Sequence, residues 1–333
     1  MQARSSSFLP FEAALLKWAF RAMDIILHVG AHRTGTTSFQ DYMYRKAPEL
    51  ESCKIRFWGP KETRNGLFSF LQTGPDASEK SQGNAVFRIQ TALRDVEKKG
   101  IEKLFISDEN MLGTVRQNIN AERLYPNAVN RLQRVVSAID CGISKVLIST
   151  RSLDTYWCSS FAYGVSRGVD LPSPQRVNAI ACTQRSWRDV ISDVAMAVPG
   201  ADVRVLSFEA YRGRPDAYAM QGAEVVAPFD DHRKHMNGSA DLPALRRYLQ
   251  AQGKSSAALP FGMGRWNPFS NEQLAALRET YADDMMWLAA GADGKAKEIN
   301  DGSFDRAGKN LPRELKQKGQ SDEFKERKMA RPG

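Results

Sequence analysis

Residues 25–40 read IILHVGAHRTGTTSFQ. The stretch begins with an apolar run of strand length, continues through a loop with glycine at positions 30 and 35, and ends in a Thr-Thr-Ser sequence that can open a helix. Backbone N–H groups at such a strand-to-helix turn, with the positive end of the helix dipole behind them, form an anion site. The stretch therefore predicts a phosphate-binding loop within an α/β domain.

The spacing of this loop matches the nucleotide-binding pattern G-x-x-x-x-G-K-[ST] at its glycines but not at its lysine. Gly30 and Gly35 stand at the two glycine positions, whereas Thr36 stands where the pattern has Lys. In an ATP or GTP site this Lys reaches the terminal phosphates. Its replacement argues against ordinary nucleoside triphosphate hydrolysis, and Arg33 supplies a cation earlier in the loop instead.

Residues 33–37 (RTGTT) resemble the K-x-G-T-T loop with which sulfotransferases bind the 5′-phosphosulfate of 3′-phosphoadenosine 5′-phosphosulfate (PAPS). Arg33 stands where that family usually has Lys; Arg keeps the charge and adds a planar fork of donors. The resemblance implies that Arg33 offsets charge as the sulfuryl group leaves the bridging oxygen. It also implies that PAPS is the cofactor and is bound by Arg33, Thr34, Gly35, Thr36, Thr37 and Ser38.

A second segment has the same order of strand and polar residues. Residues 145–150 (KVLIST) suit a buried parallel strand and are followed at once by Arg151, with Ser159 eight positions later. This spacing resembles the sulfotransferase segment in which an Arg at a strand end and a Ser on the next helix bind the 3′-phosphate. The resemblance implies that role for Arg151 and Ser159. Taken singly, Arg151 is more typical of a surface ion pair and Ser159 of a solvated helix serine; the phosphate role depends on their combination with the first loop.

A third polar cluster follows the expected strand 104–106. Its Ser-x-Glu pattern, then Asn110, resembles the third strand end of many bacterial and carbohydrate-type sulfotransferases. Glu109 is our candidate for the general base that takes the acceptor proton, although either acid here can instead cap the next helix, and Asp108 is favoured for that role. His32 competes with Glu109 as base. His28, within the first apolar run, is expected to be buried and neutral.

The composition limits the kinds of ligand, partner and cellular compartment expected for this chain. The 333 residues suffice for one large α/β domain with extensions, and a net charge of +9 suits anionic ligands. The chain has no helix-turn-helix, zinc-finger or aromatic RNA-binding signature, so nucleic acid is not an expected partner. Four scattered cysteines and no apolar run of transmembrane length are typical of a reduced, cytoplasmic protein. With only four histidines, a metal site has little support.

The organisation expected is a sulfotransferase domain over 23–290 between two extensions. Residues 1–22 can form a short amphipathic helix on the domain or on a membrane surface. Residues 291–333 are charged and predict a flexible tail, which can contact an anionic acceptor or a membrane. Peripheral membrane association is therefore compatible with the cytoplasmic assignment.

The alternation of apolar runs and amphipathic stretches predicts a three-layer α/β/α fold with a central parallel sheet. By resemblance this is the P-loop NTPase-like sulfotransferase fold. Ser270 should cap a helix, with Gln273 completing a capping box, and 53–84 is expected to be a loop-rich insertion at the mouth of the site. The other expected helices are 38–50, 87–99, 124–139 and 185–198, and 203–208 is a further strand.

The function expected from the resemblance is transfer of the sulfuryl group from PAPS to a hydroxyl or amine of a carbohydrate, glycolipid or small metabolite, without a metal. One alternative is a P-loop small-molecule kinase or other enzyme that uses a nucleoside triphosphate, which lacks its lysine at Thr36. Another is a non-catalytic nucleotide-binding protein with a degenerate site, for which Arg33 in place of Lys is the argument. The oligomeric state is not predicted.

Overall fold

The computed structural model describes residues 23–68, 79–225 and 238–300. Its contacts divide the chain into two units, residues 1–299 and 300–333, and the fold described below belongs to the first. The expected amphipathic helix within 1–22 lies outside the described residues, as do residues 301–333 of the expected tail. No helix in the described part of the chain is both long and apolar enough to cross a membrane.

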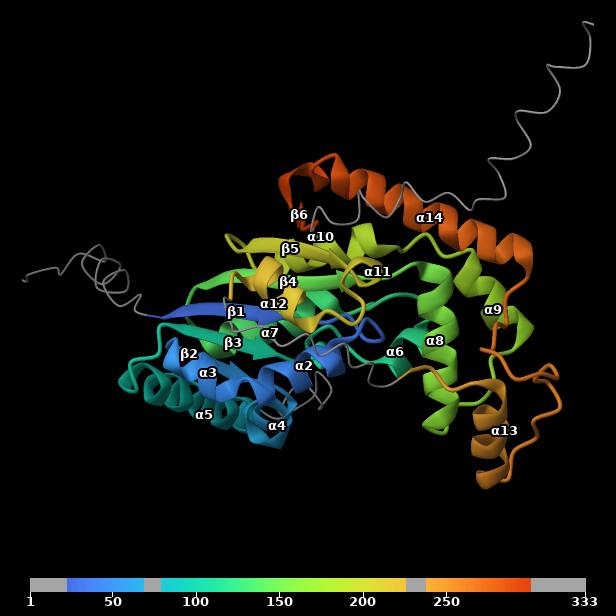
Figure 1. The fold of residues 1–333 in the computed structure, drawn as a ribbon, viewed down its shortest axis with the longest axis horizontal. Helices are drawn as coiled ribbons and strands as arrows, with labels where there is room; N and C mark the ends of the chain where they lie inside the picture. Colours follow the sequence, from blue (N-terminus) through green and yellow to red (C-terminus); the bar gives the residue numbers. More distant parts are fainter. Residues whose placement is uncertain (1–22, 69–78, 226–237, 301–333) are drawn as a thin grey trace, which may run out of the picture. The chain divides into compact units, whose positions relative to one another are not determined.

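A single sheet of six strands, all parallel, forms the centre of the fold (Figure 1). The strands lie in the order β2-β3-β1-β4-β5-β6. In the register of β1 with β3, Asp24 pairs with Lys103 and His28 with Ser107. The bounds are β1 Asp24–His28, β2 Ile55–Trp58, β3 Lys103–Ser107, β4 Ile143–Thr150, β5 Asp202–Ser207 and β6 Lys297–Glu298.

Helices cover both faces of the sheet because its central strands are apolar on both sides. Ile25 and Leu27 of β1 belong to one buried cluster, whereas Ile26 belongs to a second cluster on the opposite face. The first cluster includes side chains from α5 (Glu79–Lys98), α7 (Ala128–Ile139), α8 (Leu153–Ser166), α10 (Trp187–Ala197), α13 (Leu242–Ala251) and α14 (Asn271–Ala289). The second includes side chains from α2 (Thr36–Arg45), α3 (Ala47–Ser52) and α12 (Pro215–Ala223). The prediction of an α/β fold with a central parallel sheet is confirmed.

Shorter elements connect these layers. They are α4 Pro60–Glu62, η1 Thr63–Leu67, η3 Glu109–Met111, α6 Val115–Ala121, α9 Pro174–Ala181, α11 Phe208–Tyr211 and η4 Ala292–Gly294.

The strand order creates a crevice at one place on the sheet edge. From β1 the chain continues to β2 and β3 on one side, whereas from β4 it continues to β5 and β6 on the other. Because β1 and β4 are neighbours whose connections leave in opposite directions, the carboxyl ends of these two strands flank a topological switch point. The loop after β1 and the residues after β4 therefore lie beside one crevice.

Three expectations about the elements are corrected. The loop-rich insertion expected over 53–84 contains the buried strand β2 and the start of α5. Helix α7 begins at Ala128 and not at residue 124, because Tyr125 has a positive φ of 40° and precedes Pro126, a pair that interrupts a helix. The sheet also continues past residue 290, since β6 lies in the range expected to be tail; two polar residues, Lys297 and Glu298, carry no apolar pattern that would reveal a strand.

The predicted cap of α14 is confirmed. Ser270 accepts a hydrogen bond from the backbone N–H of Gln273, and the Gln273 side chain accepts one from the N–H of Ser270. This reciprocal pair satisfies two N–H donors that a helix start otherwise leaves open.

Candidate functional site

The loop after β1 depends on glycine at two positions with positive φ. Gly30 has φ 97°, and a Cβ atom there would lie 2.7 Å from the Cβ of Glu109. Gly35 has φ 86° and is the N-cap of α2. Any other residue at position 30 would be strained and would also push the end of β3 away. These glycines therefore allow the loop and the Glu109 backbone to approach each other closely.

The threonine hydroxyls shape the loop from within. Thr34 and Thr36 both donate through Oγ1 to the carbonyl of Ala31, at 2.7 and 2.8 Å. Ser38 donates its backbone N–H to the carbonyl of Gly35, at 3.0 Å. The backbone N–H groups of Thr36 and Thr37 lie in the first turn of α2, where a helix has no internal acceptor for them. The loop thus offers main-chain donors and the helix dipole to an anion, while two of the predicted hydroxyl donors, Thr34 and Thr36, hold the loop closed.

Arg33 connects this loop to α8. Its Nε donates to Ser159 Oγ at 2.9 Å, and Nη2 donates to Ser239 Oγ at 3.4 Å. The two serine hydroxyls are 2.7 Å apart, and the guanidinium lies 5.1 Å from the ring centre of Tyr163. Burial lowers the pKa of Arg33. The predicted residues Arg33 and Ser159 are therefore in direct contact, and Ser239 is a third partner that the sequence did not indicate.

Arg151 follows β4 and reaches the same loop. Its Nη1 donates to the carbonyl of Arg33 at 2.6 Å, and its guanidinium lies 4.6 Å from the ring centre of Phe208. Burial lowers the pKa of Arg151 to about 10; Glu209 opposes this, whereas the charges of Arg33 and two further arginines add to it. A buried cation among like charges gains stability from a neighbouring anion. The surroundings of Arg151 thus favour an anionic ligand.

The two acids after β3 have different surroundings. Asp108 is buried, caps η3 by accepting from the N–H of Asn110, and forms an ion pair with Arg64 at 2.8 Å. Glu109 lies at the pocket and accepts from Gln40 Nε2 at 3.0 Å. Asp108 therefore has the structural role expected for it, whereas Glu109 is the one of the two acids that lines the pocket.

The pKa of Glu109 reflects opposing influences. Burial alone would raise it, but the charges of His32 and Arg64, together with a 2.8 Å hydrogen bond from Arg64, lower it to about 2. Glu109 is consequently an ionised carboxylate at neutral pH.

His28 is buried and His32 is half-buried, and desolvation lowers the pKa of each. His28 contacts Ser107 Oγ through Nδ1 at 2.8 Å, so its hydrogen-bond partner is a side chain and not the backbone. His32 contacts Tyr125 through Nδ1 at 3.1 Å and Asn110 through Nε2 at 3.3 Å. Because both ring nitrogens of His32 are engaged, the arrangement favours a positioning role for it over that of a general base.

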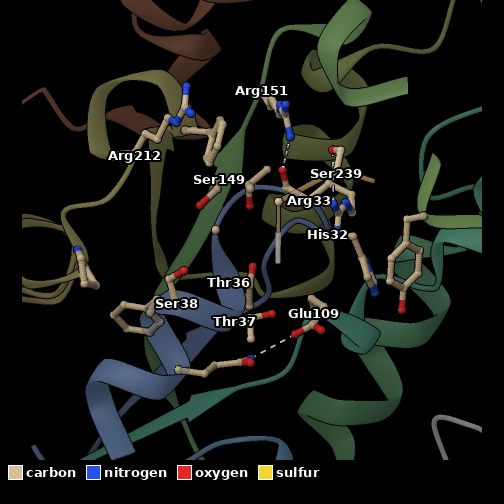
Figure 2. A pocket seen from close by; sticks show the side chains of 18 of the residues that line it. His32, Arg33, Thr36, Thr37, Ser38, Glu109, Ser149, Arg151, Arg212 and Ser239 are labelled. Atoms are coloured by element: carbon tan, nitrogen blue, oxygen red, sulfur yellow. Dashed lines mark hydrogen bonds between the residues drawn. The ribbon is translucent and has the colours of Figure 1, made fainter. Parts of the chain in front are cut away.

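These residues surround a pocket of about 970 Å³, a volume at the upper end of the range for small-molecule sites. Figure 2 shows Thr36, Thr37 and Ser38 at the start of α2, with Arg151 and Arg212 on one side and Glu109 on another. Among the described residues that line it, Glu109 is the sole carboxylate. Seven arginines line it: Arg33, Arg64, Arg151, Arg167, Arg212, Arg214 and Arg265.

Several lining residues were not predicted. Arg212 and Arg214 follow β5, and the rule that ligands bind beyond the carboxyl ends of parallel strands could have identified them. Arg64 comes from the helical turn η1 after the unexpected strand β2, so no sequence signal identified it. Ser159 is buried beneath the pocket and is absent from its lining, but it contacts two lining residues, Arg33 and Ser239.

The described part of the chain holds no group of three or more His, Cys, Asp or Glu side chains placed to bind a metal ion.

Comparison of the sequence with models of known protein families gave no match, and comparison with curated proteins gave none either.

Proposed function

We propose that this chain is a PAPS-dependent sulfotransferase with the P-loop type of sulfotransferase fold. The observation that carries the proposal is the meeting of two anion-binding segments at one pocket. The main-chain donors at the start of α2 and the guanidinium of Arg151 both face it, and seven arginines but only one carboxylate line it within the described chain. Such a pocket suits a ligand with two separate anionic groups.

The main groups of the pocket have distinct roles in this proposal. The N–H groups of loop residues 34–38 hold the phosphosulfate, and Arg151 and Ser159 hold the 3′-phosphate. The Arg33 guanidinium stabilises the bridging oxygen as its bond to sulfur breaks. When bound, PAPS supplies the activated sulfuryl group. Glu109 accepts the proton of the acceptor hydroxyl; a carboxylate with a pKa of about 2 is a weak base, so it acts late, once the bond to sulfur has made the hydroxyl oxygen more acidic.

The kinase alternative is less well supported by the side chains at the pocket. No lysine is among the described residues that line it, and Thr36 already donates its hydroxyl to Ala31. The carboxylate of Glu109, the one acidic oxygen donor for magnesium there, is bound by Arg64 and Gln40. A magnesium-dependent phosphoryl transfer would require both arrangements to change.

A nucleotide-binding protein without turnover is the second candidate, and one observation favours it. The Arg33 guanidinium donates to two serines on the α8 side of the loop. A residue that stabilises the leaving oxygen must instead reach the phosphosulfate at the start of α2. Turnover therefore requires Arg33 to leave Ser159 and Ser239 when the ligand binds.

Calorimetric titration tests the binding half of the proposal. The full chain should bind 3′,5′-diphosphoadenosine in the presence of EDTA, and more tightly than 5′-AMP, which lacks the 3′-phosphate. Tighter binding of ATP with magnesium would contradict the proposal and support the kinase. Incubation with radiolabelled PAPS and a cell extract then tests turnover: a labelled acceptor supports the sulfotransferase, and tight nucleotide binding without transfer supports the non-catalytic candidate.

A further inference from the structure

Two apolar side chains protrude from the loop that follows α13. Phe261 is fully exposed, at 101%, and Met263 is 79% exposed. The chain is anchored on either side of them, because Leu259 and Trp266 are buried in the first of the two apolar clusters, the one that includes Ile25 and Leu27. A pair of large apolar side chains displayed between two anchors calls for a partner that covers them.

Hydrogen bonds hold this loop in its protruding form. The guanidinium of Arg246 donates to the carbonyls of Pro260 and Gly262, and the N–H of Leu242 donates to the carbonyl of Gly264 at 3.0 Å. Arg246 thus links α13 to the loop. The exposure of Phe261 and Met263 is a built feature of the fold.

The segment that carries the protruding side chains has a net positive charge. Residues 238–270 contain four cations against one acid, Asp241, whose carboxylate caps α13. One of the cations, Lys254, is paired with Asp170, and three arginines remain: Arg246, Arg247 and Arg265. Exposed apolar side chains on an arginine-containing segment are the combination that inserts into an anionic lipid surface, where apolar burial and attraction to headgroups act together.

We propose that the loop 260–265, with Phe261 and Met263 at its tip, docks this chain onto an anionic membrane surface. The charge favours lipid phosphates over an apolar protein groove. The docking does not depend on the sulfotransferase proposal. Arg265 of this loop lines the pocket, as does Tyr248 of the neighbouring helix α13, so docking brings the pocket to the headgroup layer. Together the two proposals favour a lipid-linked hydroxyl as the acceptor, and this last step alone rests on the proposed function.

Co-sedimentation of the full chain with lipid vesicles tests the docking. One set of vesicles contains phosphatidylcholine alone, and the other also contains phosphatidylglycerol. We expect binding to the second set, weakened at least about tenfold by F261S/M263S because about 1.4 kcal/mol of apolar insertion corresponds to that factor. The matched control F87S/M196S removes an exposed Phe and an exposed Met from α5 and α10, and it should bind like the unchanged protein.

Two outcomes would overturn the docking proposal. One is failure of the unchanged chain to sediment with anionic vesicles. The other is equal binding by F261S/M263S and F87S/M196S, which would assign any membrane contact to another part of the chain. A thermal unfolding midpoint measured for each variant shows that it is folded. Titration with 3′,5′-diphosphoadenosine is a separate readout, so failure of docking and failure of the proposed function are distinguishable.

Discussion

Arg151 donates a hydrogen bond of 2.6 Å to the backbone carbonyl of Arg33, a residue 118 positions earlier in the chain. The contact joins the loop after β1 to the residue after β4, the two neighbouring strands at the switch point of the sheet. Trp187 anchors the other end of this link by donating its indole N–H to the carbonyl of Arg151 at 2.7 Å. The two anion-binding segments are therefore mechanically coupled, and disturbing one should alter the other.

Replacing Arg151 with Ala should weaken binding of both PAPS and 3′,5′-diphosphoadenosine. The loss should be about tenfold to a hundredfold, because a hydrogen-bonded charge pair contributes roughly 1.5–3 kcal/mol. Calorimetric titration measures it, with Arg94→Ala on the exposed face of α5 as the control for loss of one charge. Equal affinities in the two variants would remove Arg151 from the site.

Replacing Arg33 with Ala should lower kcat more than it lowers affinity. The expected drop is about 10²- to 10³-fold, the size of losing one donor to a developing oxyanion. Ser159→Ala removes the hydroxyl proposed to bind the 3′-phosphate and keeps the Arg33 guanidinium, which now contacts that hydroxyl, so its main effect should be on nucleotide affinity. Steady-state kinetics with PAPS compares the variants, and an unchanged kcat in Arg33→Ala would refute a catalytic role.

Variants of Glu109 and Asp108 should differ in what they lose: the first mainly catalytic activity, the second mainly stability. Glu109→Gln should reduce kcat by about 10²- to 10⁴-fold, as expected for loss of a general base. It should cost less stability than a change at Asp108, because Glu109 lines the pocket and caps no helix. Asp108→Asn should instead destabilise the protein, since the buried Asp108 carboxylate caps η3 and pairs with Arg64. Rate and urea-unfolding measurements on both variants check this. Loss of activity only in Asp108→Asn would reverse the assignment.

The parts of the fold that the sequence predicted are those governed by local pattern. Strands β1 and β4 are buried on both faces and therefore read as apolar runs, and the cap at Ser270 is a local signal. Strand β6 pairs through two polar residues, and its place is decided by contact with β5, which no local pattern encodes. Strand β2 was hidden because glycine, proline and charged residues surround its four-residue run.

The candidate site shows the same division. The loop after β1 and Arg151 after β4 lie directly behind strands that the sequence predicts as apolar runs, so their position at the carboxyl edge of the sheet followed from the topology. Arg64 and Ser239 reach the site from segments whose placement depends on the folded chain, and they bind predicted residues there. The sequence also could not show that Thr34 donates its hydroxyl inward to Ala31, since hydroxyl direction is set by the closed loop.

His28 should make stability depend on pH in a defined window. Burial lowers the pKa of His28 from 6.5 to about 4. Between pH 6.5 and pH 4, His28 is therefore protonated in the unfolded chain but neutral in the folded chain. Stability contributed by neutral His28 is present above pH 6.5 and is lost as the pH falls toward 4, by on the order of 3 kcal/mol. Urea unfolding across this range should show the loss.

The variant His28→Asn isolates that contribution. It should be less stable at pH 6.5 and above, because it leaves a gap beside Phe39 and Tyr218. Its stability should nevertheless fall less steeply than that of the unchanged protein between pH 6.5 and 4. The two slopes should differ by about 1.4 kcal/mol per pH unit where His28 alone titrates. Parallel pH profiles for the two proteins would show that His28 is not the titrating group.

Gly30 and Gly200 provide a matched pair for the close approach at the loop. Both have positive φ, 97° and 81°, but a Cβ at Gly30 would lie 2.7 Å from Glu109 Cβ, whereas a Cβ at Gly200 would meet nothing within 4 Å. Gly200→Ala should cost about 1–2 kcal/mol for backbone strain alone. Gly30→Ala should cost about 1–3 kcal/mol more, since it adds a clash that the end of β3 must relieve. Because that clash falls on Glu109, Gly30→Ala should also lower kcat, and equal losses of stability in the two variants would show that the loop yields without moving Glu109.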